Sequence, residues 1–117
     1  MLSIKRRVRK QSFVEIMKEG VFLHSPSFYL RFISKNDTSP SLFGFVVPNK
    51  VKKTSVGRHL IKRKISSIVE KVLLTVKPGY WVIIFTKKDV SALPLSKIEK
   101  EIIELLKEGK MLNEKQT

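Results

Sequence analysis

The sequence predicts an α+β fold, a single-domain sandwich in which a mixed sheet of about four strands packs against three helices. Three stretches with helical periodicity alternate with stretches of period two, which is the pattern of a mixed helix–sheet protein. At 117 residues and 42% apolar composition, the chain can build one ordinary core. No repeat or linker divides it, so we expect one domain over residues 1–117, with 1–10 as a basic arm and 111–117 as a polar tail.

A short first helix is predicted after the basic arm. Ser12 and Glu15 have the spacing of a capping box, and Gly20 is placed to end the helix. Its apolar face consists of Phe13, Ile16 and Met17. Residues 2–10 carry five cations and no acid, and they fit either a frayed tail or an arm lying along a phosphate backbone.

Two strands are predicted between this helix and the next. Residues 27–34 alternate, with Phe28, Leu30 and Phe32 on an apolar face and a mixed opposite face. Residues 41–48 are more apolar, end at Pro48 and are expected to be the more central strand. The turn-forming residues between them predict a hairpin.

The stretch of residues 51–76 organises the chain, and it contains a long basic helix with Thr54 or Ser55 as its cap. Its apolar stripe at helical spacing consists of Ile61, Ile65, Ile68, Val69 and Val72. A separate basic face consists of Arg58, His59, Lys62 and Arg63, with Ser66 next along it. No acidic residue lies between Asp37 and Glu70, so nothing nearby in sequence neutralises this face.

A third strand and a third helix complete the prediction. Residues 80–86 follow the Pro78–Gly79 turn and are apolar enough to be buried on both faces. Ser96 and Glu99 form a second capping-box pattern. The helix that it opens turns inward Ile98, Ile102, Leu105 and Leu106.

The charge of the chain restricts its partners. A net charge of +14 and a pI near 10.3 imply nucleic acid, an anionic membrane or an acidic partner. No stretch is long enough to span a membrane, and no secretory signal is present, so a cytoplasmic protein is expected. The stripe of the basic helix lacks Trp or Phe to anchor in headgroups, which disfavours the membrane surface. Cysteine is absent, which excludes disulfides and thiolate metal sites.

The basic face has two interpretations. Most charged helix faces are merely solvated, but such helices are usually stabilised by Glu–Lys pairs one turn apart. The basic segment lacks these pairs and instead places like charges four residues apart, as at Arg58 and Lys62. Binding to a polyanion is therefore favoured.

Catalytic constellations are missing from the sequence. His24 and His59 have no carboxylate near them in sequence, and Asp37 and Asp89 fall in expected loops. There is no HExxH, phosphate-binding loop, GxSxG or paired aspartate. We therefore predict no catalytic residue and no metal site in the protein itself.

The segment NKVKKTSVGRHLIKRKI resembles the signature of the bacterial ribonuclease P protein family. The turn lysine is matched by Lys50, and the basic positions of the helix by Arg58, Lys62 and Arg63. The flanks agree: residues 6–20 resemble the family's first helix, and the segments at 78–80 and 95–96 its last third. The resemblance covers residues 2–110. The departures are His59 in place of Asn, Leu60, Ser66 in place of Arg, and Met17 at an often aromatic position, which suggests a divergent member.

The resemblance implies a sandwich with an unusual left-handed βαβ crossover, a fold shared with a domain of a small-subunit ribosomal protein. It also implies a partner, ribonuclease P RNA, which removes the 5′ leader of precursor tRNA with Mg²⁺ held by the RNA. The protein would bind no cofactor itself, with one protein per RNA. The residues implied for binding the catalytic RNA are Lys50, Lys52, Lys53, Arg58, His59, Lys62, Arg63 and Lys64. Those implied for a leader-binding groove are Phe13, Met17, Tyr29 and Arg31.

Three other interpretations remain. Phe13 could be an ordinary core residue rather than a stacking platform. The whole chain could be a stand-alone RNA-binding or ribosome-associated module that stimulates no cleavage. A nuclease acting without RNA is disfavoured, because the sequence offers no carboxylate cluster.

Overall fold

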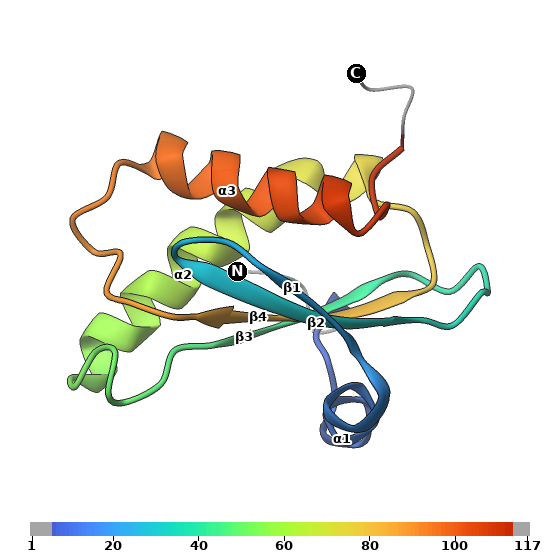
Figure 1. The fold of residues 1–117 in the computed structure, drawn as a ribbon, viewed down its shortest axis with the longest axis horizontal. Coiled ribbons are helices and arrows are strands. Elements are labelled where there is room, and N and C mark those ends of the chain that lie inside the picture. Colours follow the sequence, from blue (N-terminus) through green and yellow to red (C-terminus); the bar gives the residue numbers. More distant parts are fainter. Residues whose placement is uncertain (1–5, 114–117) are drawn as a thin grey trace.

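A four-stranded mixed sheet separates one helix from two others in the computed structural model, which describes residues 6–113 (Figure 1). In chain order the elements are α1 (Lys10–Glu19), β1 (Val21–His24), β2 (Phe28–Ser34), β3 (Leu42–Val46), α2 (Ser55–Val72), β4 (Tyr80–Thr86) and α3 (Leu95–Glu108). A short 3₁₀ turn, Leu73–Thr75, follows α2. Helix α1 covers one face of the sheet, and α2 and α3 cover the other.

The strand order is β1-β2-β4-β3, which contradicts the expected hairpin of residues 27–34 and 41–48. Strand β4 lies between β2 and β3, antiparallel to the first and parallel to the second. It takes this place because residues 82–86 are all buried, whereas β3 is mostly half-buried and lies at the edge rather than the centre. The real hairpin pairs β2 with β1, a four-residue strand that sequence reasoning missed because it is short and mostly exposed.

Parallel β3 and β4 are joined through α2 by a left-handed crossover. In Figure 1, β2 lies in front, β3 is the rear strand, and α2 runs above the sheet. Seen from the side of α2 with β3 and β4 both pointing up, β4 lies to the left of β3. The connection from β3 through α2 to β4 is therefore left-handed. Nearly all such connections in proteins are right-handed. The family resemblance implied this exception, which hydrophobic patterning alone would disfavour.

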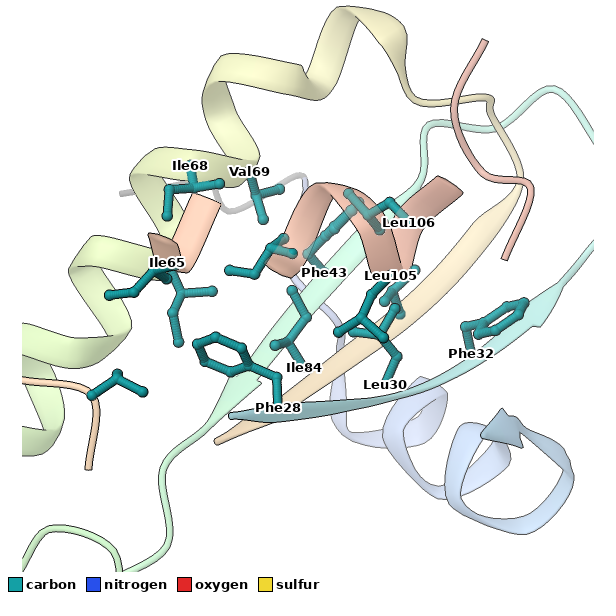
Figure 2. Packing of buried hydrophobic residues seen from close by; sticks show 14 of the residues in the cluster. Phe28, Leu30, Phe32, Phe43, Ile65, Ile68, Val69, Ile84, Leu105 and Leu106 are labelled. Atoms are coloured by element: carbon teal, nitrogen blue, oxygen red, sulfur yellow. The ribbon is translucent and has the colours of Figure 1, made fainter. Parts of the chain in front are cut away.

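The main core lies between the sheet and the pair α2 and α3 (Figure 2). Strand β2 contributes its fully apolar face, as predicted. The predicted stripe of α2 is buried at Ile61, Ile65, Ile68 and Val69, with Val72 half-buried. The predicted inner face of α3 is buried at Ile98, Ile102, Leu105 and Leu106. A smaller cluster under α1 contains Ile16, Ile83 and Phe85.

One predicted helix cap is confirmed and two are wrong. The Oγ1 atom of Thr54 accepts the backbone N–H of Gly57 at 3.1 Å, which caps α2. Helix α1 begins at Lys10, two residues before the predicted cap, and leaves Ser12 buried inside it. Helix α3 begins at Leu95 directly after Pro94, so Ser96 is already inside the helix. At α1 the capping pattern is overridden by packing, which buries Ser12. At α3 it is overridden by Pro94, which fixes an earlier start.

Both predicted tails are partly built into the fold. Met111 is fully buried, and the Asn113 N–H donates to the Thr75 carbonyl at 2.7 Å, so a polar tail starting at 111 is wrong; residues 114–117 lie outside the described part. The Val8 N–H donates to the Phe43 carbonyl at 3.0 Å along the outer edge of β3. Residues 6–10 are therefore not a free arm, while residues 1–5 lie outside the described part.

The hairpin of β1 and β2 is fastened to α3 by one carboxylate. An Oε1 atom of Glu101 accepts the Ser25 hydroxyl at 2.5 Å and the Ser27 N–H at 2.8 Å. Burial acts to raise the pKa of Glu101, but the hydrogen bonds from Ser25 and Ser27 outweigh it and lower the pKa. The folded state therefore favours the ionised carboxylate.

We expect Glu101→Gln to lower the free energy of unfolding at neutral pH by about 1 kcal/mol, a value reduced for partial exposure. A carboxyl whose pKa is lower in the folded than in the unfolded state stabilises the folded protein at pH values above its unfolded pKa. This contribution is lost as the pH falls through the folded-state pKa. The difference between Glu101→Gln and wild type should therefore shrink as the pH falls below 4.5, the usual glutamate value. Denaturant unfolding at several pH values measures this; a difference that is constant with pH would contradict it.

Candidate nucleic-acid interface

The basic helix surface comprises the outward cations of α2 and of the turn before it: Lys50, Lys52, Lys53, Arg58, His59, Lys62, Arg63 and Lys64. The structure brings all eight onto α2 or its N-terminal turn. Lys50, Lys53, His59 and Arg63 are exposed, and the others are half-buried. The first turn of α2 contains no acid, so the positive end of the helix dipole adds to this charge. Such a helix end attracts anions, phosphates included.

Three of these cations have protein partners. The Nη1 atom of Arg58 donates to the carbonyls of Lys52 at 3.0 Å and Lys53 at 2.8 Å, which fixes the turn. The Nζ atom of Lys52 pairs with an Asp89 carboxylate oxygen at 3.0 Å. Asp89 comes from the loop after β4, so the expectation that no acid neutralises this surface holds along the sequence but not in space. The Nζ of Lys64 reaches the Ser91 carbonyl in the same loop at 3.4 Å.

Asp89 remains a carboxylate through the physiological range. Hydrogen bonds from Ser91, followed by the one from Lys52, lower its pKa from 3.8 to about 2. The side chain is exposed, so the ion pair is screened by solvent and salt. A phosphate that approaches the turn can therefore compete with Asp89 for Lys52.

A cavity of about 200 Å³ lies beside the basic helix surface. Its walls are Arg7, Val8, Phe43, Gly44, Phe45, Lys62 and Ser66. Ser66 is fully buried here, so it belongs to the packing between α2 and the edge of β3. It therefore does not form part of the exposed basic face on which the sequence placed it.

On the opposite face, α1 crosses the sheet from the β3 edge to the β1 edge. Just before the helix, the Val8 N–H donates to the Phe43 carbonyl of β3. In the last turns of the helix, the Met17 carbonyl accepts a hydrogen bond from Arg31 Nη1 of β2 at 2.6 Å. After Gly20 the chain enters β1. Gly20 makes this exit because any Cβ there would collide with the Ile16 carbonyl oxygen. The helix therefore forms a wall that packs across β4 and β2 on this face of the sheet.

The floor beside this wall is a row of rings. Tyr29 stacks on Phe85 with centroids 4.4 Å apart and planes 4° apart, and His24 lies on the other side of Tyr29 at 5.6 Å. These three residues are direct cross-strand partners on β1, β2 and β4. In the neighbouring row the Arg31 guanidinium lies 3.9 Å from the Phe22 ring centre. We call this surface, made of α1 and the ring-bearing face of the sheet beside it, the α1 groove, after the leader-binding groove that the family resemblance implies.

Three of the four residues implied for the leader-binding groove lie together here. Met17, Tyr29 and Arg31 are half-buried and line one region. Phe13 lies one turn before Met17 on α1, is 36% exposed, and belongs to neither buried cluster. Part of Phe13 is therefore accessible to a ligand, and its role in stacking stays a prediction. The Nε of Arg31 is buried without a hydrogen-bond partner, an unusual state for a native polar group.

Sequence reasoning missed three ring residues of the groove: Phe22, His24 and Phe85. Phe85 was assigned only to a strand, and its partner Tyr29 lies far away in sequence. Phe22 and His24 lie on β1, which was not predicted. Their period-two spacing immediately after the helix-ending glycine was the available signal.

The described residues offer little for other kinds of site. Among residues 6–113 no group of three or more His, Asp or Glu side chains is placed to hold a metal ion. No helix in that part of the chain is long and apolar enough to cross a membrane.

A basic helix beside a phosphate-attracting turn, and a groove floored by rings, together define a small basic α+β protein of the RNA-binding class. Residues 2–110 match the family model described as Ribonuclease P, and the chain therefore belongs to the ribonuclease P protein family. It is accordingly a ribonucleoprotein component concerned with tRNA processing.

Solved structures with the same fold include bacterial ribonuclease P proteins. The protein from Thermotoga maritima superposes with a TM-score of 0.78 at 23% identity, covering 87% of this chain and 96% of that one. The protein from Staphylococcus aureus gives 0.80 at 19% identity, covering 95% and 100%. A mutant of the latter, described as defective in mRNA degradation activity, gives 0.80 at 19%, covering 92% and 90%. Among curated proteins no match to this sequence was found.

Proposed function

We propose that this chain is the protein subunit of ribonuclease P. It binds the catalytic RNA through the basic helix surface and the 5′ leader of precursor tRNA in the α1 groove. It thereby assists the endonucleolytic removal of the leader that makes the mature 5′ end of tRNA. One observation carries the proposal. This member of the ribonuclease P protein family has both the cationic helix α2 and the ring-bearing α1 groove.

The groove suits single-stranded RNA better than a duplex. Every base has a flat face that can stack on the partly exposed ring of Phe13, so affinity does not depend on sequence. Arg31 supplies positive charge beside the rings, and its buried Nε is a donor without a protein acceptor. A leader has variable sequence, so stacking combined with charge is a fitting mode of recognition.

The chemistry belongs to the RNA in this proposal. Two or more clustered carboxylates normally hold catalytic Mg²⁺ in protein nucleases, and the described residues contain no such cluster. The protein contributes binding and orientation, and its +14 charge offsets phosphate repulsion when two RNAs meet. We propose one protein per RNA, acting in the cytoplasm.

We expect Phe13→Ala to weaken binding of precursor tRNA by about 1–3 kcal/mol, because a ring that stacks on a leader base is lost. Mature tRNA lacks the leader, so its affinity should hardly change. Equilibrium binding of both tRNAs to the reconstituted complex measures the ratio.

Val14→Ala is the matched control, since Val14 is the neighbouring apolar residue of α1 and is 58% exposed. It should leave the precursor-to-mature ratio unchanged. If Phe13→Ala lowered the melting temperature but left this ratio at the wild-type value, Phe13 would be a packing residue and the leader assignment would fail.

A further inference from the structure

Two exposed rings, which were not predicted from the sequence, lie on β1 at the edge of the sheet where the α1 groove ends. Phe22 is 46% exposed and His24 is also exposed. Both lie on the α1 side of the sheet, opposite Arg31 and Tyr29 respectively in the β1–β2 register. They continue the floor of the groove outward to the last strand.

The rings form one connected cluster rather than isolated side chains. Phe22 lies 5.8 Å from His24 and 5.7 Å from Tyr29 between ring centres. Tyr29 in turn stacks on Phe85. The exposure of these rings falls from the edge inward, from His24 and Phe22 through half-buried Tyr29 to Phe85 at 7%. Within the described residues, α1 is the only helix on this face (Figure 1).

The two ends of the groove differ in their surroundings. At the β3 edge, the chain leaves Val46 and soon enters the basic turn with Lys50 and Lys53. At the β1 edge, the groove ends at the exposed rings. An RNA strand that starts near the basic helix surface and follows α1 therefore leaves the protein across β1.

We infer that Phe22 and His24 form an outer stacking site on β1 for leader nucleotides distal to the cleavage site, reached when the leader follows α1 as proposed above. The inference rests on the proposed function, since it takes the catalytic RNA to lie at the basic helix surface. The ligand class is single-stranded RNA, chosen because ring faces lie beside the Arg31 cation. It assigns this chain a second stacking site for longer leaders.

The size of the groove sets the leader length at which the site is reached. Crossing four strands involves three interstrand spacings, or about 14 Å. At about 3.4 Å per stacked nucleotide, this is about four nucleotides. Short leaders should therefore stay within the inner groove, and longer ones should gain the outer rings.

The test measures binding of mature tRNA and of precursors with leaders of about two and about eight nucleotides to the reconstituted complex. Wild type should gain affinity from the short to the long leader. Phe22→Ala should remove this gain, a loss of about fivefold to tenfold, and leave the short leader and mature tRNA unchanged. Phe22→Tyr, which keeps a ring, should restore it, whereas Phe22→Leu should not.

Val21→Ala is the matched control, because Val21 is 56% exposed on the same strand and points to the other face. The inference is overturned if wild type gains nothing from the longer leader, or if Phe22→Ala weakens short and long leaders equally. A wild-type complex that does not distinguish precursor from mature tRNA at any length would instead refute the proposed function.

Discussion

Protein freed of all RNA is expected to leave precursor tRNA uncut, whereas the same protein added to ribonuclease P RNA should lower the Mg²⁺ concentration needed for cleavage. The first result follows because no described cluster of carboxylates can hold catalytic metal. The second follows because the cations of the basic helix surface replace part of the Mg²⁺ that screens phosphate repulsion. Cleavage at the mature 5′ end is measured across a Mg²⁺ titration, with and without the protein.

The matched control for this titration is Lys71→Ala. Lys71 lies in the last turn of α2 and pairs with Glu99 at 3.0 Å, so its loss removes one charge outside the basic helix surface. It should shift the Mg²⁺ requirement less than Lys62→Ala does. Cleavage by protein that persists after exhaustive nuclease treatment would refute the assignment of the chemistry to RNA.

We expect Ile65→Ala to lower the free energy of unfolding by about 2–5 kcal/mol. Ile65 is fully buried in the core between α2 and the sheet, and Ile68 lies near it on the same stripe (Figure 2). Removing its outer carbons leaves a cavity that close-packed neighbours fill only in part. Denaturant unfolding measures the loss, and a loss well under 1 kcal/mol would contradict this position in the core.

Lys62→Ala is the companion variant, three residues earlier and on the half-buried basic side of the same helix. Its stability should stay close to wild type. Its binding to ribonuclease P RNA should weaken, and the slope of log affinity against log salt should fall by about 1 because one phosphate contact is lost. An unchanged slope, or unfolding as severe as in Ile65→Ala, would contradict the division of α2 into a core stripe and an RNA-binding face.

The elements with strong periodicity could be predicted from the sequence. The buried stripe of α2, the inner face of α3 and the apolar face of β2 follow from spacing alone, because each buries one side against a single core. Strand β4 was recognised because residues on both of its faces are apolar. These patterns depend on burial, which the sequence records directly.

Strand pairing could not be predicted in the same way. The turn between residues 34 and 42 resembles a hairpin connection, yet β4 enters between the two strands from much later in the chain. The outcome depends on which strand buries most surface, a comparison across the whole molecule. The two capping boxes failed for different reasons: Ser12 is buried inside α1, and α3 begins earlier than Ser96 because Pro94 precedes it.

The candidate interface was only partly accessible from sequence. The cations of α2 are close in sequence, and the structure places them together, but the Asp89 partner of Lys52 comes from another loop. The groove residues Met17, Tyr29 and Arg31 followed from the family resemblance, and the structure brings them to one surface. Phe22 and His24 were missed because β1 itself was missed.

The central position of β4 has a consequence for how the protein is made. The strand that joins β2 to β3 is the last one to leave the ribosome, and Met111 completes the core later still. Until then, β2 and β3 have apolar faces but no shared partner. Native pairing therefore needs contacts between distant segments, which slows folding and extends the time in which the newborn chain can aggregate. The chain therefore has to be made at least to the end of β4, and to Met111 for the full core, before this sheet can assemble.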